Sequence, residues 1–201
     1  KKSGTVGQIG CTSFFPSKNL GCYGDGGAMV CNDDALAEKL RMIANHGQKK
    51  KYYHDLIGVN SRLDSIQAAV LNIKIKYLDD YCLARKKVAD QYTEAFKGIG
   101  SLITPLEVSY SSHVYHQYTL KVTDGRRDQL VEYLTSKHIP SMIYYPVPLY
   151  EQEAFKQIKG DIDFLPVTDQ LCKEVISLPI HTEMKPGDLN MIISAVKSFF
   201  N

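Results

Sequence analysis

The 201-residue sequence predicts an α/β protein with two lobes joined by a long helix. Short apolar runs that predict strands alternate with amphipathic segments that predict helices, an order typical of mixed α/β domains. Residues 61–97 contain neither proline nor glycine, and their apolar side chains recur close to the helical period. Because such a helix exceeds the diameter of a small domain, we expect it to connect a first lobe, residues 1–98, with a second, residues 99–201.

The first lobe is predicted to begin with two strands and a helix. Residues 9–15 are apolar and β-branched enough for a short buried strand, and residues 28–31 predict its neighbour. Asn32, Asp33 and Asp34 offer N-cap side chains for the helix that follows. Gly47 can end that helix in a left-handed conformation.

The second lobe is predicted to alternate strands and helices. Strands are expected at 115–122 and 142–145, the latter just before two prolines. A helix is expected after Asp124, ending at Pro140, and a terminal amphipathic helix at 189–200. This order makes the lobe an α/β or α+β domain.

Composition argues against several classes of protein. With 24 basic and 22 acidic side chains, the net charge of +2 gives no electrostatic reason to expect nucleic acid binding. The apolar stretches are far shorter than the roughly 20 residues that cross a membrane. Five cysteines without a Cys-x-x-Cys pair argue against a metal site or disulfide framework, so we expect a cytoplasmic protein. The lysines at 49–51 indicate a solvated loop or, alternatively, a basic binding module.

Lys18 lies in the stretch SFFPSKNLGCYGDGG, residues 13–27. Its neighbours are mainly apolar, and burial among them would favour the neutral amine, which can attack an aldehyde carbon. The glycines that follow permit positive φ angles and close backbone approach. Their spacing matches neither of the common glycine-rich nucleotide-binding motifs. An inert lysine before a glycine-rich turn is the alternative interpretation.

This stretch resembles the cofactor-lysine segment of the DegT/DnrJ/EryC1/StrS family of sugar-nucleotide aminotransferases. A second block, HGQ at 46–48 and GVNSRLDSIQAA at 58–69, agrees with that family. Weaker similarities follow at 144–149 and 177–181, so the resemblance covers nearly the whole chain. It implies the carboxy-terminal part of a fold type I enzyme that depends on pyridoxal phosphate: a remainder of the large domain and a small α/β domain. The second block looks most like enzymes that aminate UDP-2-acetamido-3-oxo-glucuronate.

The resemblance also implies roles for individual residues. Lys18 matches the lysine that binds the cofactor covalently and later moves a proton between substrate and cofactor. Ser13 matches a serine that hydrogen-bonds the cofactor phosphate. Asn60 matches an asparagine that reaches this phosphate from the neighbouring subunit of a homodimer. Arg62 falls where relatives place an arginine near the substrate, where a guanidinium suits a carboxylate or phosphate.

For Asn60 and Arg62, the alternative is a helix cap and surface charge. Substrate contacts are also expected from His46, Tyr145 and His181, although each histidine suits a structural hydrogen bond equally well. The expected substrates are a nucleotide sugar and glutamate. Related dehydratases carry histidine in place of the lysine, so Lys18 argues against that activity.

The family normally has about as much chain again before this segment, including the aspartate that pairs with the cofactor ring. We therefore expect a truncated chain that is inactive alone. A non-catalytic assembly or interaction fragment is the alternative.

Overall fold

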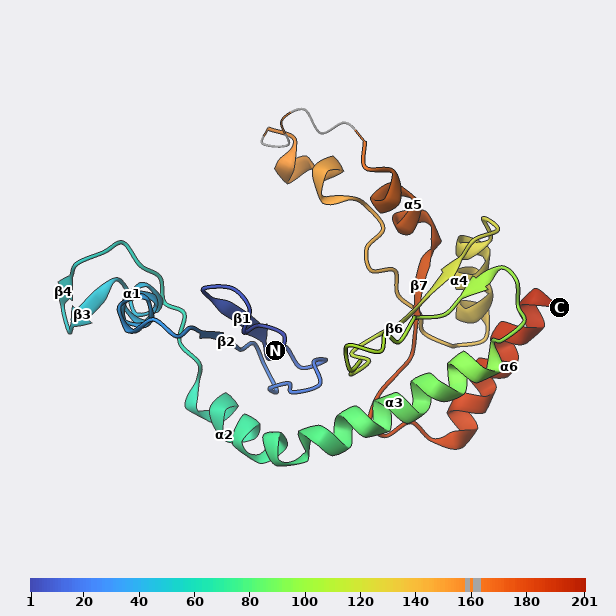
Figure 1. Ribbon diagram of the computed structural model, residues 1–201, viewed down its shortest axis with the longest axis horizontal. Helices are drawn as coiled ribbons and strands as arrows, with labels where there is room; N and C mark the ends of the chain where they lie inside the picture. Colours follow the sequence, from blue (N-terminus) through green and yellow to red (C-terminus); the bar gives the residue numbers. More distant parts are fainter. Residues whose placement is uncertain (158–159, 161–163) are drawn as a thin grey trace. The chain divides into compact units, whose positions relative to one another are not determined.

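The computed structural model describes residues 1–157, 160 and 164–201, which form two compact units, Lys1–Asp79 and Asp80–Asn201 (Figure 1). The division falls earlier than the expected boundary between residues 98 and 99. The reason is helix α3 (Leu78–Ala95), whose buried Val88, Ala89 and Tyr92 belong to the core of the second unit. Most of the expected connecting helix is thus part of the second unit.

The expected helix is also not continuous. Helix α2 (Ser65–Lys74) is followed by a 3₁₀ turn, η1 (Ile75–Tyr77), before α3 begins at Leu78. The absence of proline and glycine correctly predicted helical backbone over residues 65–95, but residues 61–64 lie before the helix and residues 96–97 form a turn. The change in hydrogen-bonding pattern at η1 leaves no mark in composition.

The first unit opens with the expected pair of neighbouring strands, β1 (Gly10–Ser13) and β2 (Gly27–Val30), which are antiparallel. The expected burial of the first strand is wrong: only Gly10 of β1 is buried, because this sheet has two strands and the apolar core lies in the second unit. Helix α1 (Asp34–Ala44) follows, and Asp33 is its N-cap, accepting a 2.9 Å hydrogen bond from the Leu36 amide. Between α1 and α2 a short hairpin, β3 (Gln48–Lys50) and β4 (Tyr53–His54), projects from the chain.

That projecting segment, residues 46–59, is here called the arm. Its two ends are joined by a bridge between Asn45 and Asn60 and by a 2.9 Å hydrogen bond from the His46 amide to the Val59 carbonyl. Gly47 has a φ of +75°, and a Cβ at this position would lie 1.7 Å from the Leu56 carbonyl oxygen. Only glycine therefore allows the arm to return so closely to its starting point.

The second unit contains one antiparallel sheet in the order β5-β6-β7: β5 (Leu102–Ile103), β6 (Tyr118–Val122) and β7 (Val175–Leu178). Its helices besides α3 are α4 (Arg127–Ser136), α5 (Pro166–Glu174) and α6 (Pro186–Phe200). Two 3₁₀ turns, η2 (Leu149–Glu151) and η3 (Glu153–Phe155), precede α5.

The strand expected at 142–145 is not formed. Met142 alone pairs with β7, through an isolated bridge to Ser177. Pro140, Pro146 and Pro148 surround this segment, and proline lacks the amide that a longer ladder would need.

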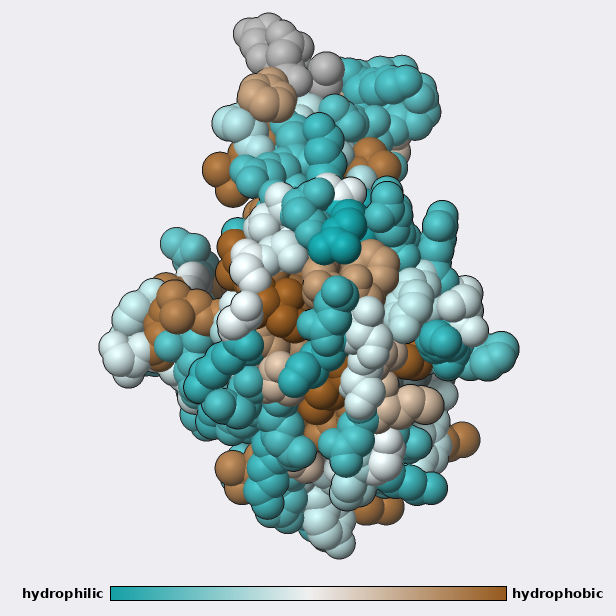
Figure 2. Space-filling model, turned by 90° about the vertical axis from the view of Figure 1, so that its right-hand side faces the viewer, coloured by the Kyte–Doolittle hydropathy of each residue, from teal (hydrophilic) through white to brown (hydrophobic). Residues whose placement is uncertain are grey.

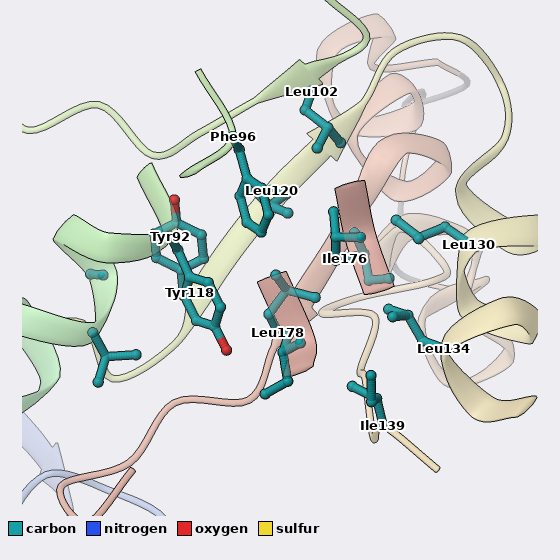
Figure 3. Packing of buried hydrophobic residues seen from close by; sticks show 14 of the residues in the cluster. Tyr92, Phe96, Leu102, Tyr118, Leu120, Leu130, Leu134, Ile139, Ile176 and Leu178 are labelled. Carbon is teal, nitrogen blue, oxygen red and sulfur yellow. The ribbon is translucent and has the colours of Figure 1, made fainter. Parts of the chain in front are cut away.

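The apolar core lies entirely in the second unit. Figure 3 shows side chains from α3, α4, β6 and β7 pointing toward one another around Leu120 and Ile176, which are completely buried. Tyr92 stacks on Phe96 with ring centroids 5.7 Å apart, and its hydroxyl donates to the Pro179 carbonyl. This packing joins α3 to the sheet.

Hydrophilic side chains cover most of the face shown in Figure 2, and apolar side chains appear only in small groups between them. Among the described residues, no helix is both long and apolar enough to cross a membrane.

Candidate functional site

Lys18 lies in a loop that joins β1 to β2 and closes on itself at its base. The Phe14 amide donates to the Gly26 carbonyl at 2.7 Å, and the Cys22 amide donates to the Phe14 carbonyl at 2.7 Å. The Lys18 amide donates to the Phe15 carbonyl at 2.8 Å, forming a tight turn just before the lysine side chain. The backbone around Lys18 is therefore held by local hydrogen bonds.

Gly21 allows this loop to fold tightly. A Cβ at this position would lie 2.5 Å from the Pro16 carbonyl oxygen and 2.8 Å from that of Phe15. The expected close backbone approach is thus confirmed here. The expected positive φ is not observed at any of the loop glycines, since the positive-φ glycines lie elsewhere in the described chain.

The apolar enclosure expected around Lys18 is not formed by its sequence neighbours. Lys18 itself is half-buried, but Phe15 is 52% exposed and Tyr23 is 79% exposed. Apolar side chains in a surface loop face water unless another element of the fold covers them. Neighbours in the sequence do not supply that element.

Ser13 ends β1 and begins the same loop. Its hydroxyl oxygen accepts a 3.2 Å hydrogen bond from the Phe15 amide, and the residue is exposed. The hydroxyl retains a proton to donate, so it suits an anionic oxygen such as that of a phosphate.

Asn60 and Arg62 lie together in the segment that leads into α2. The Arg62 Nε donates to the Asn60 Oδ1 at 3.1 Å, which orients the guanidinium and the amide on one surface. They line an open recess with Asp25–Gly27 at the end of the Lys18 loop and with Cys11 and Thr12 of β1. Helix α2 begins only at Ser65, with Asp64 as its N-cap, so Asn60 is not a helix cap.

Two histidines of the arm, His46 and His54, make hydrogen bonds at its base. The His54 Nδ1 donates to the His46 carbonyl at 2.8 Å, a bond within the arm. His46 has a φ of +60° and donates its amide to Val59. The backbone of His46 is thus structural, while its ring remains an expected substrate contact.

Tyr145 and His181 lie in the second unit. Tyr145 is 71% exposed, and its ring meets that of Tyr144 edge-on with centroids 5.6 Å apart. The His181 Nδ1 accepts a 3.2 Å hydrogen bond from the Glu183 amide in a tight turn. Both remain predictions as substrate contacts.

Two residues of α2 contact the Lys18 loop, although no role for either of them was predicted from the sequence. The Gln67 Oε1 accepts hydrogen bonds from the amides of Tyr23 (2.9 Å) and Gly24 (3.1 Å). The Lys74 Nζ donates to the Gly21 carbonyl at 2.7 Å. Their seven-residue spacing, which puts both on one helical face, is the only sequence signal for this shared role.

The described residues contain no group of three or more histidine, cysteine, aspartate or glutamate side chains that could hold a metal ion. Polar groups at Lys18 and the recess include an amine, a hydroxyl, an amide and a guanidinium, and the recess is also lined by the Asp25 carboxylate. Apart from this carboxylate, the set donates hydrogen bonds and carries positive charge, which suits an anionic ligand.

A family model described as "DegT/DnrJ/EryC1/StrS aminotransferase family" matches residues 1–197. The chain belongs to this family. The predicted resemblance and fold class are confirmed, and the aminotransferases of this family depend on pyridoxal phosphate. The amine of Lys18 and the donors on Ser13, Asn60 and Arg62 fit a phosphate-bearing aldehyde of this kind.

Two curated relatives show how similar the chain is to known members. It is 42% identical over 199 residues to a "Pleiotropic regulatory protein" of Geobacillus stearothermophilus, covering 98% of this chain and 53% of the relative. It is 41% identical over 196 residues to the UDP-2-acetamido-2-deoxy-3-oxo-D-glucuronate aminotransferase of Pseudomonas aeruginosa, again covering 98% and 53%. The chain therefore spans about half the length of the curated relatives that it matches.

Among solved structures, the chain is similar to DesV of S. venezuelae, determined in complex with a ketimine intermediate. The TM-score is 0.90 at 36% sequence identity, and the match covers 97% of this chain and 52% of DesV. The described elements therefore follow the fold of about half of such an enzyme.

Proposed function

We propose that the protein containing this chain transfers an amino group from glutamate to a keto sugar nucleotide, with Lys18 as the covalent anchor of pyridoxal phosphate. The observation that carries this proposal is the closed loop that presents Lys18 directly after Ser13, within a chain of this family. The loop's hydrogen bonds fix the backbone on both sides of the lysine, so its amine has a defined position.

Each residue has a role in this reaction. Bound pyridoxal phosphate supplies an electron sink for charge that develops on the substrate carbon. Lys18 would hold the cofactor through its side-chain amine and, as a free amine, would move a proton at the substrate carbon. Ser13 and Asn60 hold the phosphate by hydrogen bonds, and the Arg62 guanidinium pairs with an acidic group of the substrate.

The substrate is proposed to be a UDP-linked 3-keto sugar used for amino-sugar or surface polysaccharide synthesis. The P. aeruginosa relative, named for its action on a UDP-linked 3-oxo sugar, supports this choice, and a relative in Acidithiobacillus ferrooxidans is named a UDP-N-acetyl-3-dehydro-alpha-D-glucosamine 3-aminotransferase. Other relatives are named for action on dTDP sugars, so the relatives agree on a sugar as the substrate but differ in the nucleotide attached to it. His46, Tyr145 and His181 are proposed to contact this substrate.

The working enzyme is proposed to be a cytoplasmic homodimer in which Asn60 completes the partner's phosphate site. The exposure of Asn60 and Arg62 supports this, because their side chains are accessible to a second copy. The present chain is proposed to be inactive alone, since it spans about half the length of its relatives. Robust turnover of the isolated chain with glutamate and a keto sugar nucleotide would contradict that part.

An assembly or interaction fragment without catalysis is the second candidate. It is favoured by the large apolar side chains that the first unit leaves exposed, such as Ile57 and Ile66.

The decisive measurement is the absorbance of the full-length protein with pyridoxal phosphate. Cofactor bound to a lysine absorbs near about 400 nm, and Lys18→Ala should abolish this band and all transamination. Lys39→Ala, which removes an exposed lysine of α1, is the matched control and should keep both. A band that persists unchanged in a folded Lys18→Ala protein refutes the proposal.

A further inference from the structure

We infer that Gln67 and Lys74 are positioning residues that hold the Lys18 loop, and with it the cofactor-binding amine, against helix α2. The inference deepens the proposed function and rests on it for the role of Lys18. The two residues are called the α2 clamp below.

The clamp makes three hydrogen bonds to the backbone of the loop. The Gln67 Oε1 accepts from two consecutive amides, those of Tyr23 and Gly24, at 2.9 and 3.1 Å. The Lys74 Nζ donates to the Gly21 carbonyl at 2.7 Å and lies 5.5 Å from the centre of the Tyr23 ring. Amide donors and a carbonyl acceptor of the loop are thus paired with matching side chains of one helix.

The two residues lie on the buried face of α2. Gln67, Leu71 and Lys74 are spaced by four and three residues, which places them in one row along the helix. Leu71, between them, is 8% exposed, and Gln67 and Lys74 are half-buried. Ile66 and Ile73, outside this row, are strongly exposed, so the row is the face of α2 that meets the loop.

The loop is therefore held at two places. Its base is closed by its own backbone bonds at Phe14, Cys22 and Gly26. The clamp holds residues 21–24, which follow Lys18 on the returning side of the loop. Lys18 lies between these attachments, so loss of the clamp would release one of the two constraints on its position.

The clamp also relates two parts of the proposed site. The end of the loop, Asp25–Gly27, and the segment Asn60–Leu63 line the same recess, and the latter leads into α2. Because α2 holds the loop and also follows Asn60 and Arg62, the clamp connects the Lys18 loop of one proposed site to the segment that carries Asn60, which is proposed to complete the partner's site.

The experiment compares variants of the full-length protein. Gln67→Leu removes the acceptor at similar size, and Gln67→Glu keeps an oxygen that accepts both amides. Lys74→Met removes the donor and keeps the length of the side chain. Asn72→Leu and Lys76→Met are matched controls at exposed positions in α2 and η1. Two quantities are measured: amide hydrogen exchange at residues 19–26, and the rate at which added pyridoxal phosphate attaches to Lys18, trapped with borohydride and located by mass spectrometry.

We expect Gln67→Leu to accelerate exchange at Tyr23 and Gly24 by on the order of tenfold, because two hydrogen bonds are lost. Lys74→Met should accelerate it less, and both variants should slow attachment to Lys18. Gln67→Glu should behave like the wild type in both measurements, as should the two controls.

Unchanged exchange in Gln67→Leu overturns the contact itself. Faster exchange with wild-type attachment overturns the positioning role. If the wild-type protein does not attach the cofactor at Lys18, the proposed function fails, and the exchange measurements still decide whether the clamp holds the loop.

Discussion

The two units of this chain are stabilised in different ways. The second unit buries a continuous apolar cluster drawn from α3, α4, α6 and the sheet. In residues 1–79, all of which the structure describes, Cys22 and Leu71 are the only buried apolar side chains. The first unit is held instead by backbone hydrogen bonds, loop closures and the α2 clamp. Packing therefore dominates in one unit, and local hydrogen bonding in the other.

The two units also differ in how many of the candidate functional residues they carry. The candidate residues Lys18, Ser13, Asn60 and Arg62 all belong to the less buried first unit. Ile57 is 99% exposed and Ile66 is 76% exposed in the first unit, and these are large apolar side chains. The second unit also exposes large apolar side chains, such as Leu106 at 82% and Leu149 at 72%, so exposed apolar surface is common to both units.

The largest expected effect separates the two units directly. Leu120→Ala in the second unit should lower the free energy of unfolding by about 3 kcal/mol, because it leaves a cavity in a packed core. Ile57→Ala in the first unit should change it by less than about 0.5 kcal/mol. Urea unfolding followed by circular dichroism measures both. Equal effects would show that the difference in burial does not control stability.

The next effect tests a buried charge in the second unit. The Arg85 Nη1 donates to the carbonyls of Tyr115, His116 and Ile180 at 3.3, 3.0 and 3.1 Å. Arg85→Met should destabilise the protein by about 2 kcal/mol, since buried carbonyls lose a charged donor. Lys87→Met, at an exposed position of the same helix, is the control for urea unfolding. A loss no greater than that of the control would contradict the role of Arg85.

The smallest effect is a pH dependence confined to the second unit. Burial raises the pKa of Tyr118 from 10.0 to about 12, and its hydroxyl is hydrogen-bonded to Thr93. The folded protein therefore keeps the phenol proton more tightly than the unfolded chain does. The contribution of Tyr118 to the free energy of unfolding should be constant below about pH 10 and should be lost as the pH rises from about 10 to 12.

Tyr118→Phe is the matched variant for this pH dependence. It should make the fall in the free energy of unfolding at alkaline pH shallower without abolishing it, because burial also raises the pKa of Tyr92. Unfolding measured at a series of alkaline pH values checks both proteins. An identical slope in Tyr118→Phe would show that this tyrosine does not contribute.

Elements with local signals were predictable from the sequence. The strands near 9–15 and 28–31, the Asp33 cap and the terminal helix depend on neighbouring residues, and the structure confirms that they form. The burial expected of the first strand failed, because burial depends on elements distant in sequence. The expected strand at 142–145 failed, because only Met142 finds a partner and that partner is distant in sequence. The boundary at 98 differed for a similar reason, since the packing of Tyr92 and Phe96 decides where α3 belongs.

In the candidate site, too, residues close together in the sequence were predictable and contacts between distant residues were not. Ser13 and Lys18 lie in one continuous stretch, so sequence comparison could find them together. The contacts of Gln67 and Lys74 join residues far apart in the chain and depend on the register of α2. The missing enclosure around Lys18 likewise depends on elements that short-range sequence does not specify.

The closed base of the arm allows the tip of the arm to vary in sequence. Asn45 pairs with Asn60, and Gly47 allows the chain to turn sharply there, so both ends of the arm are fixed independently of its tip. Residues 50–53 can therefore change in length or character without displacing Asn60 or Arg62, whereas His54 and Asp55 belong to the base through their bonds to His46 and Gly47. Proteins that share this arm can therefore differ in its tip and still keep the segment that carries Asn60 and Arg62 in place.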